Sequence, residues 1–140
     1  MSGVLDVLPV GRAPRGRTTG WELAVQTFTL DESQLSQEYG IGIGRWEEHP
    51  KKQPLPFDAM WCRIPAHSES APDEHPEVEL AVVVGGTAVF TVDGTEVTAG
   101  PGTAVLLSPG ERHVIKAAGE PVRILSVYWL PSAAGSGEAG

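Results

Sequence analysis

The chain is poor in several residue types, and each scarcity excludes a class of protein. It has one cysteine, Cys62, among 140 residues, so no disulfide can form within the chain. Only 10 lysines and arginines stand against 18 aspartates and glutamates, and the net charge of −8 argues against nucleic acid as the main partner. The longest apolar run, Leu80–Val84, is far shorter than the roughly 20 residues that span a bilayer.

The N-terminus also lacks the pattern of a signal peptide. Met1-Ser2-Gly3 is not followed by a basic region and a long apolar run. Together with the single cysteine, this predicts a cytoplasmic location and no membrane partner. The length favours one domain, which at this size buries roughly 68–70% of the surface of its unfolded chain.

Short apolar or alternating runs, separated by glycine and proline, dominate the chain from Phe57 onward. Asp93-Gly94 lies between two such runs and predicts a hairpin. Many short strands with turns roughly every 8–12 residues are typical of a β-sandwich or barrel. The predicted strands are Trp21–Thr29, Ile41–Trp46, Phe57–Ile64, Val78–Val84, Thr87–Val92, Ala104–Leu107, His113–Ala117 and Val122–Leu130.

The two ends of the chain differ in composition from its middle. Residues 1–19 are rich in glycine, proline and arginine and predict a flexible arm, and residues 131–140 predict a disordered tail. We therefore place one barrel domain at 20–130, with its core motifs at 57–130.

A short helix is predicted before the second strand. Asp31 resembles its cap, with Gln34 three residues further on. Gly40 ends it after one or two turns.

A cluster of metal-ligand types precedes and enters the most apolar strand. Asp73, His75 and Glu79 have the same parity, so in an extended chain their side chains point to one face. His113 follows a Pro-Gly turn later in the chain. Because a buried carboxylate is costly unless it is paired or coordinated, the pattern predicts one divalent metal held by His75, Glu79 and His113. Asp73 is either a fourth ligand or a loop residue, and a metal-free pair of His75 and Glu79 is the alternative.

The same residues resemble the cupin family, small β-barrels of the jelly-roll type. The first cupin motif, G-x5-H-x-H-x3,4-E-x6-G, is matched by His75, Glu79 and Gly86. The second motif, G-x5-P-x-G-x2-H-x3-N, is matched by Gly102, Gly110 and His113. The resemblance implies an all-β fold: a single cupin jelly-roll β-barrel with a short N-terminal extension that contains one short helix.

Four positions depart from the cupin motifs. Asp73 stands at the first motif histidine, His67 at the leading glycine and Ala117 at the terminal asparagine. Ser108 stands at the proline of the second motif, with Pro109 beside it. Some cupins keep the barrel and bind no metal, so the substitution at Asp73 leaves both readings open.

The resemblance also implies a function. It implies a metal-dependent cupin enzyme that acts on a small polar metabolite, with Glu79 as a candidate catalytic base. Residues 39–47 and 125–129 resemble zinc cupins that form nitrogen–nitrogen bonds in natural products with an aminoacyl-tRNA-synthetase-like partner. Zinc is therefore favoured, with iron, manganese and nickel as alternatives, and a partner biosynthetic enzyme is expected.

Two other kinds of function stay open. The barrel could be a non-catalytic module that binds or senses a small molecule, or a structural barrel without chemistry. In each case a homodimer is expected, partly from the resemblance. Apolar side chains on the face opposite Glu79 also need cover. These are Val78, Leu80, Val82 and Val84.

Four further polar or reactive residues have simpler readings. Cys62 is predicted to be a core residue, and Arg63 to form a surface salt bridge. His67 and Glu69 are predicted to lie in a solvated loop.

Overall fold

The computed structural model describes residues 25–132, which form two units that are treated separately. The first comprises residues 25–29 and 50–54, and its described part has no helix or strand. The Gln26 side chain joins its two segments. Its Nε2 atom donates to the carbonyl of Pro50 over 2.8 Å, and its Oε1 atom accepts from the amide of Lys52 over 2.8 Å.

The second unit, residues 30–49 and 55–132, is built almost entirely from antiparallel strands. Its strands form a six-stranded sheet in the order β1-β2-β3-β9-β4-β7 and a three-stranded sheet in the order β6-β5-β8. The strands are β1 (Ser36–Glu38), β2 (Ile41–Arg45), β3 (Asp58–Ile64), β4 (Val78–Gly85), β5 (Ala88–Val92), β6 (Thr95–Ala99), β7 (Ala104–Leu107), β8 (His113–Ala117) and β9 (Val122–Trp129). This arrangement confirms the predicted all-β fold.

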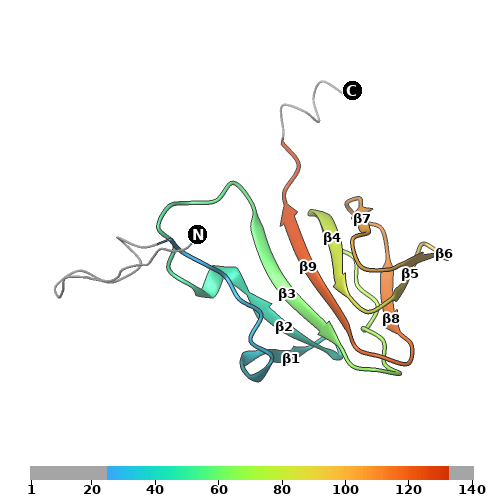
Figure 1. Ribbon diagram of the computed structural model, residues 1–140. Coiled ribbons are helices and arrows are strands. Elements are labelled where there is room, and N and C mark those ends of the chain that lie inside the picture. Colours follow the sequence, from blue (N-terminus) through green and yellow to red (C-terminus); the bar gives the residue numbers. More distant parts are fainter. Residues whose placement is uncertain (1–24, 133–140) are drawn as a thin grey trace. The chain divides into compact units, whose positions relative to one another are not determined.

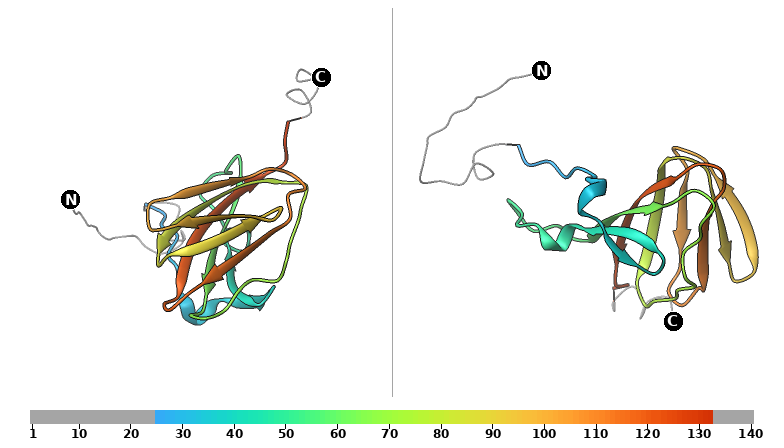
Figure 2. Two further views of the ribbon diagram at one scale, coloured as in Figure 1. Left: turned by 90° about the vertical axis from the view of Figure 1, so that its right-hand side faces the viewer. Right: turned by 90° about the horizontal axis from the view of Figure 1, so that it is seen from below.

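The two sheets of this unit enclose its hydrophobic core. Figure 1 shows β3, β9 and β4 side by side, with β5, β6 and β8 grouped at the right. In the left view of Figure 2 the strands of the smaller sheet lie in front of those of the larger one. Fully buried side chains come from both sheets, such as Ile64, Val83 and Ile124 from the larger and Phe90 from the smaller. Alternate residues of each strand therefore point into one shared core.

The hairpin predicted at Asp93-Gly94 is present and connects β5 to β6 through a two-residue turn. Both turn residues have positive φ, 46° at Asp93 and 84° at Gly94, as the hairpin turns that match strand twist require. Asp93 also bonds to Arg112 through its amide and its carboxylate, over 2.9 and 3.0 Å. The turn thus also fixes the loop that leads into β8.

Some predicted elements differ from the structure. The strand predicted at 21–29 is wrong over residues 25–29, where no partner strand pairs with the backbone, and its first four residues lie outside the described part. The predicted helix is a single 3-10 turn, Glu32–Gln34, capped by Asp31 as expected. A second 3-10 turn, Trp46–Glu48, and strand β1 were not predicted, and β6 was implied by the predicted hairpin but given no bounds.

The predicted arm and most of the predicted tail cannot be compared with the structure. Residues 1–19 and 133–140 lie outside the described residues. The barrel boundaries at 20–130 remain a prediction, and the described strands run from Ser36 to Trp129.

Gly86, the last residue of the first cupin-like motif, occupies a position that only glycine fits. Its φ is +75°, and a Cβ atom there would lie 2.2 Å from the carbonyl oxygen of Pro121. The close approach joins the end of β4 to the start of β9. Gly94 also has a positive φ, +84°, but a Cβ there would meet no atom within 4 Å.

These two glycines give a matched test of that close approach. Gly94→Ala should cost only the strain of a left-handed backbone, about 1–2 kcal/mol of unfolding free energy. Gly86→Ala adds a clash with backbone and should cost roughly 3 kcal/mol or more. Urea denaturation of both variants measures the difference, and equal losses would contradict the proposed role of the contact.

Candidate metal centre

A single backbone bridge brings two of the predicted ligands together. Asp73 and His113 exchange hydrogen bonds, Asp73 N to His113 O over 3.1 Å and His113 N to Asp73 O over 2.9 Å. Residues paired in this way carry their side chains on the same face. Asp73, in the loop before β4, and His113, the first residue of β8, thus face one site.

His75 reaches the same site from the loop before β4. The strand begins only at Val78, so the extended run predicted from Asp73 onward is interrupted by a bend at Pro76 and Glu77. The loop is held instead by the amide of Gly110, which donates to the carbonyl of His75 over 2.9 Å. The convergence predicted from parity is therefore reached by a different backbone path.

Both imidazoles are oriented by backbone carbonyls. The Nδ1 atom of His75 lies 3.2 Å from the carbonyl oxygen of Glu77, and Nδ1 of His113 lies 3.2 Å from that of Glu111. A carbonyl only accepts hydrogen bonds, so each Nδ1 carries the hydrogen. In the neutral rings, Nε2 then presents its lone pair to the cavity, as in a histidine that binds metal.

Glu79 lies between these two Nε2 atoms and is almost fully buried, with 5% of its surface exposed. Its Oε1 atom is 2.9 Å from Nε2 of His75 and 3.9 Å from Nε2 of His113. Its Oε2 atom accepts a short hydrogen bond from the Ser126 hydroxyl. Three acceptor atoms therefore converge in a buried place, which is favourable only with a proton or a cation among them.

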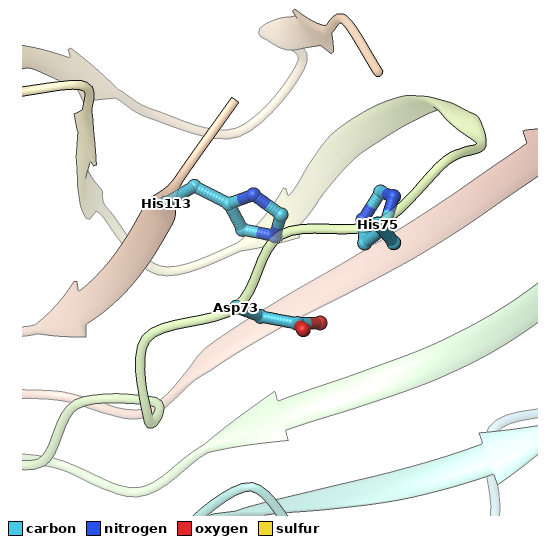
Figure 3. A group of neighbouring side chains, drawn as sticks. All are labelled: Asp73, His75 and His113. Carbon is cyan, nitrogen blue, oxygen red and sulfur yellow. The ribbon is translucent and has the colours of Figure 1, made fainter. Parts of the chain in front are cut away.

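Figure 3 shows Asp73, His75 and His113 directed toward a common region. One ligand atom from each of these three side chains lies within 4.8 Å of the other two. Glu79 contacts both histidines but is not a member of that group. The donor set fits a divalent metal: two imidazole nitrogens with one or two carboxylates, leaving coordination positions open.

The candidate ligands line a cavity of about 460 Å³. Ile41, Ile43, Met60, Cys62 and Ile115 form its apolar part. The volume lies in the range of sites for small molecules, and apolar walls with a few convergent polar groups are typical of them.

Cys62 forms part of that wall and behaves as a core residue, as predicted. It is buried, and burial followed by the nearby charge of Glu79 raises the pKa of its thiol to about 12. The thiol thus stays protonated at neutral pH and is a poor nucleophile.

The predictions for Arg63, His67 and Glu69 are also confirmed. Arg63 pairs with Glu32, its Nε atom 3.0 Å from Oε1. His67 and Glu69 are exposed residues of the loop after β3, and neither lines the cavity.

Two residues were not predicted from the sequence: Tyr128, which lines the cavity, and Ser126, which contacts Glu79. Ser126 and Tyr128 lie on β9, opposite Ala81 and Glu79 of β4. A signal for Ser126 exists in the sequence, because it is a polar residue at an inward-facing position of an apolar run. Its contact with Glu79 depends on strand order and register, which residue spacing alone does not give.

The comparisons with known proteins agree with the observed fold. A family model described as Cupin domain matches residues 60–128. A Cupin 2 conserved barrel domain protein from Salinispora arenicola has a similar structure, with a TM-score of 0.70 and 26% identity over 82% of this chain and 95% of that one. The chain belongs to the cupin superfamily.

Two further similar structures share the fold. The polyketide cyclase RemF from Streptomyces resistomycificus gives a TM-score of 0.59 at 17% identity, over 74% of this chain and 79% of that one. A Cupin_2 domain of an XRE family transcriptional regulator from Enterobacter cloacae gives 0.53 at 24% identity, over 66% of this chain and 98% of that one.

Isosteric variants test which carboxylates bind metal. Asp73→Asn and Glu79→Gln each remove one charge from the donor set without changing its shape. We expect each to lower zinc affinity by at least about tenfold, measured by competition with a chromophoric chelator. Ser126→Ala, which keeps both charges, should lower it by roughly tenfold because Glu79 loses its orienting donor. Unchanged affinity in Asp73→Asn or in Glu79→Gln would remove that residue from the ligand set, and unchanged affinity in Ser126→Ala would remove the orienting role of Ser126.

Proposed function

We propose that the chain is a metal-dependent cupin enzyme that acts on a small polar metabolite. The observation that carries this proposal is the convergence of Nε2 of His75 and Nε2 of His113 on Oε1 of Glu79 in a cavity. We assign His75, Glu79 and His113 as ligands of one divalent ion, with Asp73 as a fourth. Zinc is favoured by the nitrogen and oxygen donors and by the resemblance in residues 39–47, with iron, manganese and nickel as alternatives.

The residues of the chain would divide the work. When bound, a divalent ion supplies Lewis acidity and lowers the pKa of a coordinated water. His75 and His113 hold their Nε2 atoms in place through the carbonyls that their Nδ1 atoms contact. Ser126 binds Oε2 of Glu79 and leaves Oε1 toward the open cavity, where it could take a proton from a substrate.

The reaction itself is a narrower proposal. The resemblance to zinc cupins of nitrogen–nitrogen bond formation supports a place in natural-product biosynthesis, together with a partner synthetase. A fold shared with a polyketide cyclase is compatible with a biosynthetic role. No helix of residues 25–132 is long and apolar enough to cross a membrane, and the cytoplasmic location stays part of the proposal.

A non-catalytic binding or sensing module is the second candidate. It is favoured by the similar fold of a domain from a transcriptional regulator, which shows that such a barrel can be part of a regulator. In that case the same cavity would hold a ligand without converting it.

Metal content is the first test of the proposed function. Elemental mass spectrometry of the tag-free protein should find near one zinc per chain, and the His75→Ala/His113→Ala double variant should contain almost none. Circular dichroism controls for folding of the variant. Equal metal content in both proteins would show that the assigned site is wrong.

The enzyme and the sensor differ in what happens to the bound molecule. Zinc-loaded protein incubated with a metabolite extract should deplete a compound, and Glu79→Gln should deplete it at least about a hundredfold more slowly if Glu79 is the base. Mass spectrometry of the extract measures this. A rise in melting temperature with no depletion would support the sensor instead.

The proposed homodimer would use the outer face of the six-stranded sheet. Leu106 and Trp129, 63% and 37% exposed, pair there with Leu80 and Val78 of β4. Such an apolar face is costly in water, and a second copy of the same face would cover it.

Charge placed on that face should separate the dimer. We expect Leu106→Glu to shift the protein from dimer to monomer in sedimentation velocity. Val97→Glu, at an exposed apolar residue of the smaller sheet, is the matched control and should leave the dimer intact. A wild-type monomer at high concentration would contradict the proposal.

A further inference from the structure

The cavity continues beyond the candidate ligands to a second polar wall. This wall is formed by Arg45 at the end of β2, Glu47 in the following turn and Tyr128 on β9. It has no place in the metal chemistry above. The hydrogen bonds of these three residues indicate which chemical group a ligand must carry at the end that lies away from the candidate metal centre.

Arg45 gives this wall a cation, but the cation is already neutralised. Its Nη1 and Nη2 atoms bind the two carboxylate oxygens of Glu38 over 2.7 and 2.9 Å. The hydrogen bonds that Arg45 donates to Glu38 raise the pKa of Arg45 and lower the pKa of Glu38. A two-pronged pair of this kind is among the strongest in proteins, so a ligand carboxylate would have to displace Glu38.

Tyr128 and Glu47 complete the wall with acceptors. The Tyr128 hydroxyl donates to Oε2 of Glu47 over 2.8 Å. Burial, and next the hydrogen bond with Glu47, raise the pKa of Tyr128, so the phenol stays protonated. With its hydrogen committed to Glu47, the phenolic oxygen can only accept from a ligand, and the carboxylate of Glu47 is an acceptor as well.

The charge of the whole cavity has the same sign. Five carboxylates line it against the one neutralised arginine: Glu47, Asp73, Glu74, Glu77 and Glu79. A divalent ion at the candidate centre would offset only two of these charges. The His113 side chain, which is 7% exposed, also lacks a donor at Nε2: among residues 25–132 the polar contact of that atom is the one of 3.9 Å with Glu79.

We propose that the cavity selects a small amine in its protonated form, with the ammonium group donating to Glu47 and to the phenolic oxygen of Tyr128. The other end of the molecule reaches the candidate metal centre. This inference names the substrate class of the proposed function and rests on it. Glu47 and Tyr128 are then the residues that determine specificity.

The test uses probes that share one metal-binding head and differ at the tail. Three hydroxamic acids with the same linear chain end in an ammonium, a methyl or a carboxylate group. Their affinities for the zinc-loaded full chain are measured by calorimetry at one ionic strength. We expect the ammonium probe to bind about tenfold more tightly than the methyl probe, and the carboxylate probe to bind most weakly.

Two variants test whether the second polar wall causes the preference for the ammonium probe. Glu47→Gln keeps the shape and an acceptor for Tyr128 but removes the charge, and it should abolish the roughly tenfold preference. Glu48→Gln removes the same charge one residue further on, from a side chain that is exposed like that of Glu47 but does not line the cavity, and should keep the preference. Equal effects of the two variants would mean that net charge alone is responsible and would overturn the inference.

The remaining outcomes separate the inference from the proposed function. If zinc is bound but the three probes bind equally, or none binds, the amine preference is wrong and the metal centre stands. If the chain holds no zinc and binds no probe, the proposed function fails and the inference fails with it. Tighter binding of the carboxylate probe would show that Arg45 exchanges Glu38 for the ligand.

Discussion

The pairing of β4 with β9 is the constraint on which the rest of the structure depends. Both are interior strands of the larger sheet, and their register places Glu79 opposite Tyr128 and Ala81 opposite Ser126. Residues two apart on one face are neighbours across the pair, so Ser126 can reach Glu79. A register shift of one residue would turn these inner polar groups to the outer face. The contact of Gly86 with the backbone of Pro121 closes the end of the same pair.

The buried carboxylate of Glu79 also bears on which interpretation of the site its contacts support. A metal-free pair of His75 and Glu79 requires a hydrogen between Nε2 of His75 and Oε1 of Glu79, while the carbonyl of Glu77 requires another on Nδ1. The shared hydrogen satisfies His75 and Glu79 but does nothing for the lone pair of His113, whose ring is held the same way by Glu111. A cation shared by both rings satisfies all three groups at once. This is why the same contacts favour a metal over a simple ion pair.

The sequence predicted those parts of the molecule that depend on local pattern. Parity grouped His75 with Glu79, although the chain bends between them. The resemblance to the second cupin motif added His113, and Asp93-Gly94 marked its hairpin. The prediction was wrong at 25–29, where alternation has no partner strand to pair with. It missed β1 and gave no bounds for β6, because three to five mostly polar residues at a sheet edge carry little apolar signal. It also missed Ser126, Glu47 and Tyr128, which join the site through contacts between residues 47 and 81 positions apart in the chain.

The two ends of the cavity depend on different elements, and this bears on how one fold supports several functions. The candidate ligands come from the loop before β4, from β4 and from β8, whereas the second wall comes from β2, the turn after it and the end of β9. Substitutions at Arg45 or Glu47 can therefore change which molecule enters without disturbing the histidines. Conversely, filling the open coordination positions with protein side chains would leave a binding module with the same selectivity. In our proposals, enzyme and sensor would differ in the first set of residues, and the second set would decide the class of ligand.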